Sequence, residues 1–368
     1  MSRGLKILAL VTDAFGGYGG IAQYNCDLLQ AFAASDAVER VVVLPRIGTC
    51  ARGLALSPKI SQRSGHFGRA SYILSALRLA LAEGPFDVIF CGHLYHTPLA
   101  VALARVTGGR LWLQTHGIEA WEKPSALIHP SIDRFDLVTT VSRYTRVRIL
   151  EWSSLAPHKI RVVPNTVRPM FTPGPRDDAL LAKYGLTDRK ILLTVSRVDR
   201  ADAYKGHARV IRALAEVRRA EPAAHYVIVG DGDGRAELEA RVAAQGQGDA
   251  VTFLGRVSDD EVLALYRSSD VFVMPSTKEG FGIVFVEAAA CGLPVIAGNR
   301  DGSVDALADG AFGRLIDPGS ETDLVAAMVE ALRQGRAAAE ARAAEVTERF
   351  SQSHFTREVD GLLRTLSA

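Results

Sequence analysis

The stretch that decides the fold runs from Val271 to Gly298 and reads VFVMPSTKEGFGIVFVEAAACGLPVIAG. It opens on a short apolar run, "VFVMPS", and closes on a second one, "PVIAG", and both are typical of buried strands. The segment between them, "IVFVEAAA", is expected to form a helix that begins around Gly282 and stops at Gly292 and Pro294. A strand, a helix and a second strand in this order predict a unit of a parallel sheet.

The same alternation extends over most of the chain. Apolar runs are separated by segments with helical spacing, such as "IAQYNCDLLQAFAAS" and "DDEVLALYRSS". The further predicted strands are "KILALVTD", "RVVVLPR", "DVIFCG", "RLWLQTHG", "LVTTVS", "KILLTVSR", "HYVIVGDG" and "VTFLG". Near-continuous Val, Ile and Leu strands that alternate with helices predict α/β structure, with parallel sheets covered on both faces.

One segment interrupts this pattern. The stretch "VVPNTVRPMFTPGP" carries four prolines between Pro164 and Pro175 and is typical of a linker. We therefore expect two doubly wound, Rossmann-like domains, at about 1–165 and about 170–350, that face each other across a cleft. The last helical stretch, at about 351–368, is suited to packing on either domain. Ligands of such sheets bind outside the carboxyl ends of the strands.

Composition places limits on the class of protein. Of the 368 residues, 48% are hydrophobic and 23% are charged, as in an ordinary globular protein. Four cysteines lie far apart without a CxxC pair, which favours reduced, buried thiols over disulfides or structural zinc: Cys26, Cys50, Cys91 and Cys291. No apolar run approaches the roughly 18 residues that span a bilayer. We expect a cytoplasmic protein, either free or peripheral on a membrane.

Charge is distributed unevenly between the halves of the chain. Residues 1–165 hold 18 Lys and Arg against 11 Asp and Glu, whereas residues 166–368 hold 25 against 30. A basic first half suggests an anionic partner there, although an uneven but solvated surface explains the same counts. The motifs below give no reason to expect a nucleic acid.

Two glutamates flank a glycine-rich turn after the strand "VFVMPS". Glu279 lies in the turn, and Glu287 follows about five residues into the expected helix, roughly 7–8 Å from its start. Glycine at positions 280 and 282 allows close approach of a ligand to the backbone, and a helix N-terminus favours an anion. This spacing suits a sugar, a diphosphate and a ribose in sequence. The alternative is a loop charge and an exposed helix residue.

Cations and a histidine follow other predicted strands. Arg197 and Lys205 lie in "TVSRVDRADAYKGH" and are suited to neutralising a diphosphate, although surface charge is the alternative. His116 ends the strand in "LWLQTHGIEAW", where either a structural or a functional role is open.

Two other glycine-rich segments match known motifs poorly. "GDGDGRAELEARV" lacks the acidic residues that complete a calcium loop, so a turn into a helix is the better interpretation. "TDAFGGYGGIAQYN" matches a dinucleotide fingerprint only with Ala22 at its third glycine position. No acidic residue ends the second strand, which closes on Pro45 and Arg46, so a dinucleotide site is weakly supported.

Taken in order, these segments resemble a known family. The set comprises the GGYGG loop, the strand-end "HG", "SR…KG", "GDGDG…LE", "FLGRVSDDEVLALYRSSDVFVMPS" and Glu279-x7-Glu287 with "GFG" inside. It resembles the retaining family 4 glycosyltransferases with the GT-B fold. The resemblance covers nearly the whole chain and is densest from Thr194 to Asp317. One departure is the seven-residue loop between Arg197 and Lys205, which is longer than in many members.

The resemblance implies roles for individual residues. Glu287 is expected to bind the ribose hydroxyls of a nucleotide, and Glu279 the hydroxyls of the donor sugar. Arg197 and Lys205 are expected to hold the diphosphate, and His116 to lie beside the reacting sugar. Further groups are implied at the base (Gly255, Arg256, Val257), at the sugar and diphosphate (Phe281, Gly282, Ile283) and at the phosphates (Gly19, Gly20). The resemblance also implies that the helix at about 351–368 packs back on the first, acceptor-binding domain.

The implied activity is transfer of a hexosyl group, with retention, from a UDP- or GDP-sugar to a glycan or lipid-linked saccharide in cell-surface polysaccharide synthesis. No metal and no further cofactor is expected. A polyprenyl-diphosphate acceptor at an anionic membrane surface fits the basic first domain. Six basic residues lie in or near the helical stretch "ASYILSALRLALAEG": Arg46, Arg52, Lys59, Arg63, Arg69 and Arg78.

Three other functions stay open. A GT-B sugar-nucleotide epimerase or a phosphorylase uses the same fold and diphosphate chemistry without a separate glycosyl acceptor. A nucleotide-sugar binding protein without catalytic activity is a second alternative, which the complete set of motif residues disfavours. An oxidoreductase is the third and weakest, because the acidic residue that binds ribose in dinucleotide sites is missing.

Overall fold

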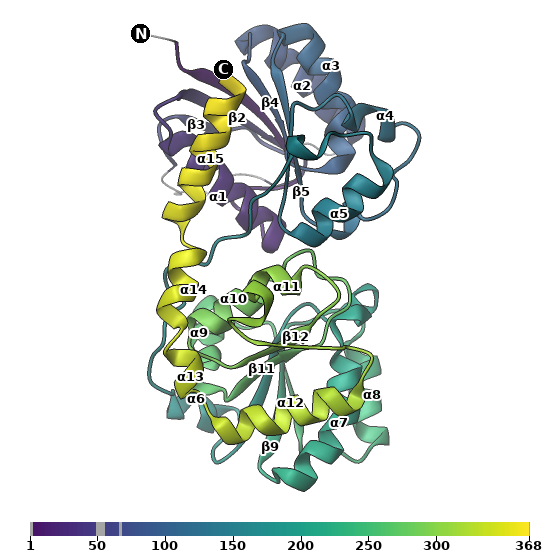
Figure 1. Cartoon of the computed structure of the whole chain (residues 1–368), viewed down its shortest axis with the longest axis vertical. Helices are drawn as coiled ribbons and strands as arrows, with labels where there is room; N and C mark the ends of the chain where they lie inside the picture. Colours follow the sequence, from purple (N-terminus) through teal and green to yellow (C-terminus); the bar gives the residue numbers. More distant parts are fainter. Residues whose placement is uncertain (1–2, 49–55, 66–67, 368) are drawn as a thin grey trace. The chain divides into compact units, whose positions relative to one another are not determined.

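A computed structural model describes residues 3–48, 56–65 and 68–367 (Figure 1). The chain divides into two compact units. Unit 1 runs to Thr166 and also includes the segment that begins at Gln352. Unit 2 is Val167–Ser351. The linker predicted from its prolines contains the first crossing between the units.

Unit 1 is built on a parallel sheet. Its described residues form seven strands in the order β3-β2-β1-β4-β5-β6-β7. The strands are β1 (Leu5–Val11), β2 (Val38–Pro45), β3 (Ile60–Gln62), β4 (Val88–Cys91), β5 (Arg110–Thr115), β6 (Leu137–Thr140) and β7 (Ile160–Val162). β1 pairs with β2 on one side and β4 on the other, so the winding of the chain reverses between β1 and β4.

Helices cover this sheet. They are α1 (Gly20–Ala34), α2 (Arg69–Glu83), α3 (Thr97–Thr107), α4 (His129–Ile132), α5 (Arg143–Trp152) and α15 (Gln352–Ser367). Short 3₁₀ turns lie at η1 (Leu94–His96), η2 (Ile118–Ala120) and η3 (Pro157–Lys159). The last helix, α15, lies along α1 in Figure 1. Phe355 packs edge-on against Tyr24, with ring centroids 5.5 Å apart, and this contact joins the end of the chain to unit 1.

Unit 2 repeats the architecture. Its sheet has six parallel strands in the order β10-β9-β8-β11-β12-β13. They are β8 (Lys190–Val195), β9 (Ala224–Val229), β10 (Val251–Gly255), β11 (Val271–Met274), β12 (Val295–Gly298) and β13 (Arg314–Ile316). β8 lies between β9 and β11, so the winding reverses between β8 and β11.

The helices of unit 2 cover both faces of its sheet (Figure 1). They are α6 (Asp178–Lys183), α7 (His207–Ala220), α8 (Arg235–Ala244), α9 (Asp259–Ser268), α10 (Ile283–Ala290), α11 (Ser303–Ala306), α12 (Glu321–Gln334), α13 (Ala337–Glu340) and α14 (Ala343–Arg349). The 3₁₀ turns are η4 (Arg200–Lys205) and η5 (Ala308–Gly310). The strand–helix–strand unit predicted from Val271 to Gly298 is confirmed as β11, α10 and β12.

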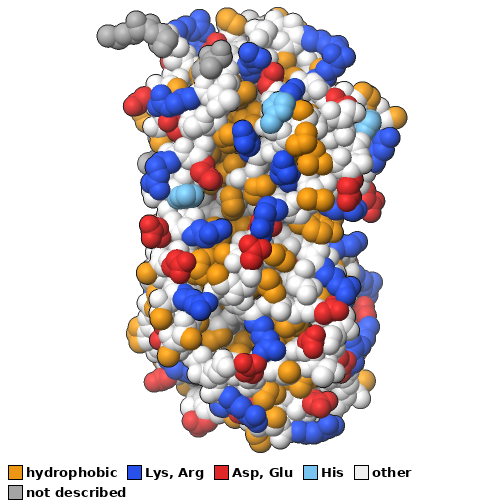
Figure 2. Space-filling model, in the orientation of Figure 1, with side chains coloured by type: hydrophobic (Ala, Val, Ile, Leu, Met, Phe, Trp, Pro, Cys, Tyr) orange, Lys and Arg blue, Asp and Glu red, His pale blue; other side chains and the backbone are white. Residues whose placement is uncertain are grey.

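The fold class predicted from the sequence is confirmed, and all ten predicted strands are present. Three strands of three residues each were not predicted: β3, β7 and β13. Cys91 and Cys291 are buried thiols, as expected, whereas Cys26 is only half-buried and Cys50 lies outside the described residues. No helix in the described part of the chain is long and apolar enough to cross a membrane. On the face shown in Figure 2, basic side chains are interspersed with acidic and apolar ones.

Candidate active site

Several predicted site residues of unit 2 lie in the loops that follow the two strands at its winding reversal. Arg197 and Lys205 follow β8, and Glu279 follows β11, the neighbouring strand. The carboxyl ends of parallel strands meet at one edge of the sheet, and the reversal opens a crevice there because successive helices depart to opposite faces. The sheet order therefore brings together residues from separate segments of the chain.

Lys205 and Glu279 form a direct ion pair. The Lys205 Nζ lies 2.7 Å from Glu279 Oε1, and each side chain is only 12% exposed. Burial raises the pKa of Glu279 above its ordinary value, against the opposing effect of Lys205. The Glu279 N–H also donates to Asp301 Oδ2 at 2.7 Å, which fixes the loop beneath the carboxylate. A second carboxylate, Asp301, thus belongs to this cluster.

Arg197 is paired more loosely on the same side of the sheet. Its guanidinium lies 3.0 Å from Asp202 Oδ2 and 3.6 Å from Asp199 Oδ2, and its side chain is 67% exposed. Both acids belong to the segment between Arg197 and Lys205, most of which folds as η4. The unusually long loop therefore supplies carboxylate partners for the cation at its start.

The turn into α10 requires glycine. Gly282 precedes the helix with φ of 85°, in the left-handed region, and a Cβ there would lie 2.5 Å from the Phe285 ring. Phe281 is buried and packs edge-on against Phe350, with ring centroids 5.7 Å apart. Ile283 is the first residue of the helix and follows Glu279 by four positions, and the first N–H groups of a helix are available to an anion.

Glu287 belongs to a second cluster, about one turn along α10. Its side chain is 9% exposed, so it is not the surface residue that the alternative interpretation required. The Tyr266 hydroxyl donates to Glu287 Oε2 at 3.2 Å, and an Arg168 nitrogen lies 3.7 Å from Glu287 Oε1. Burial raises the pKa of Glu287 to about 7, although Arg168 and Tyr266 act in the opposite direction.

The loop expected to contact a base leads directly into α9. Gly255 ends β10 with φ of 69°, and its carbonyl accepts a hydrogen bond from Gly230 N–H at 2.7 Å. Arg256 is exposed and Val257 is half-buried. Asp259 then begins α9 and pairs with Arg168. This loop is therefore linked to the Glu287 cluster by a single arginine.

In unit 1, the predicted residues surround the winding reversal of its own sheet. His116 directly follows β5, and its Nε2 lies 3.0 Å from the carbonyl oxygen of Gly92, which follows β4. Burial lowers the pKa of His116, against the opposing effect of Glu119. Gly19 and Gly20 begin α1, and a Cβ at either position would meet open space. These glycines therefore leave room for a ligand, whereas Gly17 is crowded by the Asp13 carboxylate.

Comparisons with known proteins identify the family. A family model described as "Glycosyltransferase Family 4" matches residues 18–170, and one described as "Glycosyl transferases group 1" matches residues 177–348. A GDP-mannose-dependent alpha-(1-6)-phosphatidylinositol monomannoside mannosyltransferase of Mycolicibacterium smegmatis is 31% identical over 270 residues, which cover 70% of each chain. The chain belongs to the family 4 glycosyltransferases. The family predicted from the motifs is thus confirmed.

Other matches agree with this family 4 assignment. The corresponding mannosyltransferase of Mycobacterium tuberculosis is 34% identical over 269 residues, covering 70% of this chain and 69% of that protein. A crystal structure of HepE from Anabaena in complex with UDP and glucose has a TM-score of 0.80 and 21% identity, covering 98% of this chain and all of that one. The fold is that of GT-B glycosyltransferases.

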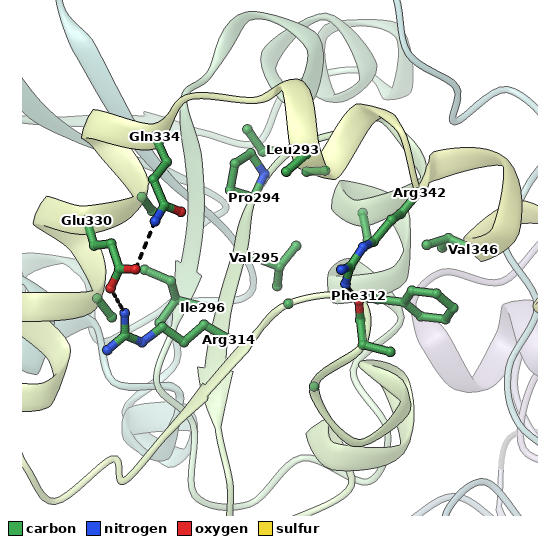
Figure 3. Close-up of a pocket in the computed structure, with 18 of the residues that line it drawn as sticks. Leu293, Pro294, Val295, Ile296, Phe312, Arg314, Glu330, Gln334, Arg342 and Val346 are labelled. Carbon is green, nitrogen blue, oxygen red and sulfur yellow. Dashed lines mark hydrogen bonds and ion pairs between the residues drawn. The ribbon is translucent and has the colours of Figure 1, made fainter.

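A pocket of about 380 Å³ lies elsewhere on unit 2 of the glycosyltransferase (Figure 3). Val295 and Arg314, which begin β12 and β13, contribute to its wall. It therefore opens at the amino ends of these strands, whereas the predicted donor residues lie at the carboxyl ends. Arg314 is paired with Glu330, and Arg342 donates to the Ala311 carbonyl, so these lining charges are already satisfied. We place the candidate active site by its chemistry and not by this pocket.

Sequence reasoning missed three residues of the glycosyltransferase site. Asp301 follows β12, and this strand-end position was a usable signal. Asp202 lies in the loop after β8, whose conformation was not predicted. Arg168 lies in the proline-rich linker, and no spacing rule connects it with Glu287. Residues drawn from separate segments escape a search for local motifs.

Proposed function

We propose that this glycosyltransferase transfers a hexosyl group, with retention, from a nucleoside diphosphate sugar to a hydroxyl of a lipid-linked or saccharide acceptor. The observation that carries the proposal is the arrangement around α10. Glu279, which pairs with Lys205, comes four residues before the helix begins, and Glu287 is the fifth residue of the helix. A diphosphate suits the helix start, and a carboxylate on either side suits the hydroxyls of the sugar and the ribose.

The chemical task is mainly electrostatic. Breaking a sugar–diphosphate bond leaves positive charge on the sugar and adds negative charge to the leaving oxygens. The N–H groups that begin α10, together with Arg197 and Lys205, stabilise that negative charge in the proposed site. The departing phosphate accepts the proton of the acceptor hydroxyl, and no carboxylate acts as a covalent nucleophile. This mechanism needs no metal ion, so activity is expected to persist in EDTA.

Among donors, we favour GDP-mannose. Relatives that are 31% and 34% identical over about 70% of this chain are named as GDP-mannose-dependent mannosyltransferases. Their named acceptor is a phosphatidylinositol monomannoside, which makes a glycolipid with an anionic headgroup the first acceptor to test. UDP-sugars should be tested as donors as well, because the Anabaena structure holds UDP and glucose.

The experiment is calorimetric titration with GDP, UDP and their sugar conjugates. We expect binding of one nucleoside diphosphate that is lost in Glu287→Ala and kept in Glu237→Ala, which removes an exposed carboxylate on α8. Nuclear magnetic resonance of the product's anomeric proton then tests retention. Release of free or epimerised sugar without acceptor would favour an epimerase, and nucleotide binding without any turnover would favour a binding protein.

We further propose that unit 1 meets an anionic membrane surface through α2. Three large apolar side chains of this helix are exposed, Ile73, Leu74 and Leu81, and Arg69 and Arg78 lie beside them at helical spacing. The other basic residues predicted for this surface are not included in the proposed membrane contact. Arg63 pairs with Glu83, Lys59 donates to the Ser35 carbonyl, Arg46 has a partner elsewhere, and Arg52 lies outside the described residues.

Sedimentation with anionic vesicles tests this surface. Each basic residue near such a membrane contributes about 1 kcal/mol, so replacing Arg69 and Arg78 by glutamine should weaken binding by roughly tenfold or more. The matched control is the double replacement of Arg218 and Arg241 in unit 2, which removes the same charge. Equal, salt-insensitive sedimentation of both variants and the wild type would contradict the proposal.

A further inference from the structure

Arg168 has its main chain fixed at the start of unit 2. The preceding residue, Val167, donates its N–H to the carbonyl of Phe350 at 2.8 Å. Phe350 in turn packs on Phe281, the residue before the Gly282 turn into α10. The segment that carries Arg168 is therefore tied to the same part of unit 2 as the candidate donor site.

The side chain of Arg168 completes a closed ring of contacts. Its guanidinium lies over the Phe171 ring, 4.8 Å from the centroid, and Phe171 packs edge-on against Tyr266, with centroids 5.7 Å apart. The Tyr266 hydroxyl donates to Glu287, and Glu287 faces Arg168 at 3.7 Å. A second nitrogen of Arg168 donates to Asp259, the first residue of α9. One side chain thus joins the linker, the start of α9, and α10.

We propose that Arg168 is a positioning residue for the nucleotide, which holds Glu287 as a charged carboxylate against the start of α9, so that this carboxylate can accept the hydroxyls of a ribose beside the base-binding segment. The proposal rests on the proposed function, because it takes Glu287 as the ribose ligand. Arg168 itself is assigned no contact with the donor.

The geometry suits this role. A carboxylate has about four acceptor positions on its two oxygens. Tyr266 occupies one position on Oε2, and Arg168 faces Oε1, so one position on each oxygen is left for the two adjacent hydroxyls of a ribose. Both hydroxyls can donate only while Glu287 is charged.

The charge of Glu287 depends on the groups packed around it. Arg168 comes from the linker, Tyr266 and Asp259 from α9, and Cys291 from the end of α10. Among these, Arg168 carries the positive charge and Asp259 opposes it. Removing the guanidinium therefore leaves burial and Asp259 to favour the protonated acid, and binding of a ribose becomes more sensitive to acid.

The test compares Arg168→Gln and Arg168→Lys with the wild type. The matched control is Arg176→Gln, which removes a surface arginine paired with Asp270 in the same unit. Affinity for GDP and UDP is measured by calorimetry between pH 6 and pH 9. In parallel, the pKa of Glu287 is measured as the midpoint of the change in the ¹³C chemical shift of its labelled side-chain carboxyl with pH. The signal of Glu287 is assigned by comparison with the spectrum of Glu287→Gln.

We expect the pKa of Glu287 to rise by about one unit in Arg168→Gln. This is the lower end of the range of pKa shifts that follow the loss of a nearby opposite charge. At pH 7 the charged fraction then falls from about a half to about a tenth, so the dissociation constant rises about fivefold. This loss should disappear by pH 9, should be smaller in Arg168→Lys, and should be missing in the Arg176 control.

If the pKa of Glu287 is the same in Arg168→Gln as in the wild type, the proposal is overturned. A loss of affinity that is equal at every pH also overturns it, because that pattern indicates direct contact with the nucleotide or a loosened fold. If the wild type binds no nucleoside diphosphate at any pH, the proposed function fails and the role of Arg168 fails with it. If the wild type binds a nucleoside diphosphate but the expected effects of Arg168→Gln do not occur, only the Arg168 proposal fails.

Discussion

Replacing Glu287 with glutamine should make unit 2 more stable at neutral pH while it abolishes nucleotide binding. The pKa of Glu287 is raised from 4.5 to about 7 in the folded chain, so folding favours the protonated acid. The corresponding stabilisation is fully present below the unfolded pKa and is lost as the pH rises through about 7. Wild-type protein therefore loses stability across this window, whereas glutamine does not titrate.

The size of the effect follows from the two pKa values. They differ by about 2.5 pH units, and each unit corresponds to about 1.36 kcal/mol, which gives about 3 kcal/mol in total. The free energy of unfolding of Glu287→Gln, relative to the wild type, should rise by about this amount between pH 4.5 and pH 8. For a unit of this size, the change corresponds to roughly 6–12 °C in melting temperature.

The assay must report on unit 2 alone, because two units need not unfold together. All three tryptophans lie in unit 1 (Trp112, Trp121 and Trp152), so intrinsic fluorescence follows the wrong unit. Amide hydrogen exchange of β8 and β9, corrected for intrinsic rates, reports the opening of unit 2 directly. Glu237→Gln on α8 is the control. Stability curves that run parallel for Glu287→Gln and the wild type would refute the reasoning.

Two further predictions concern the start of the donor site. Lys205→Ala should lower turnover by about 10²–10³ in a donor-dependent assay, while Lys183→Ala, which removes an exposed lysine of unit 2, should leave it unchanged. Gly282→Ala places a Cβ 2.5 Å from the Phe285 ring at positive φ, and should therefore cost more stability than Gly185→Ala, where φ is also positive but the space is open. Equal melting temperatures of the two glycine variants would contradict this prediction and show that the turn into α10 accommodates a Cβ at position 282.

Much of the fold follows from local patterns in the sequence. Apolar runs such as Leu5–Val11 and Val271–Met274 are buried on both faces of a parallel sheet, so their composition identifies them. The missed strands β3 and β7 are three residues long and stand at the edges of the unit 1 sheet. An edge strand of that length buries too few apolar side chains to leave a pattern, and only pairing with its neighbour defines it.

Part of the candidate site was predictable from the sequence, but the pairing of its residues was not. Position at a strand end identified Glu279 and Lys205 separately, yet their contact depends on the adjacency of β8 and β11, which is a property of the sheet. The role inferred for Arg168 illustrates the limit more clearly. Its partners Asp259 and Glu287 lie on two different helices, and their approach to the linker is decided by the packing of unit 2.

These pairings change how the predicted diphosphate site must work. Arg197 and Lys205 were expected to hold the diphosphate, and in the structure each has a carboxylate partner. With Asp199, Asp202 and Asp301 nearby, the cluster contains more acids than bases, so its net charge does not attract an anion. Attraction must then come from the N–H groups that begin α10 and from an exchange of ionic partners.

Arg197 and Lys205 differ in how readily they can exchange their carboxylate partner for a diphosphate. Arg197 is 67% exposed, but its partner Asp202 is only 7% exposed, so a guanidinium that moves away leaves a buried carboxylate behind. Asp202 keeps its hydrogen bond from the Tyr204 side chain, so this exchange leaves the carboxylate with a partner. Lys205 is only 12% exposed, and separating it from Glu279 would leave a buried carboxylate unpaired, at a cost of about 3–5 kcal/mol. Arg197 is therefore expected to move onto the diphosphate, whereas Lys205 stays on Glu279 and reaches the ligand from there. The loss of turnover in Lys205→Ala then combines a missing positive charge with a Glu279 carboxylate that is no longer held for the sugar.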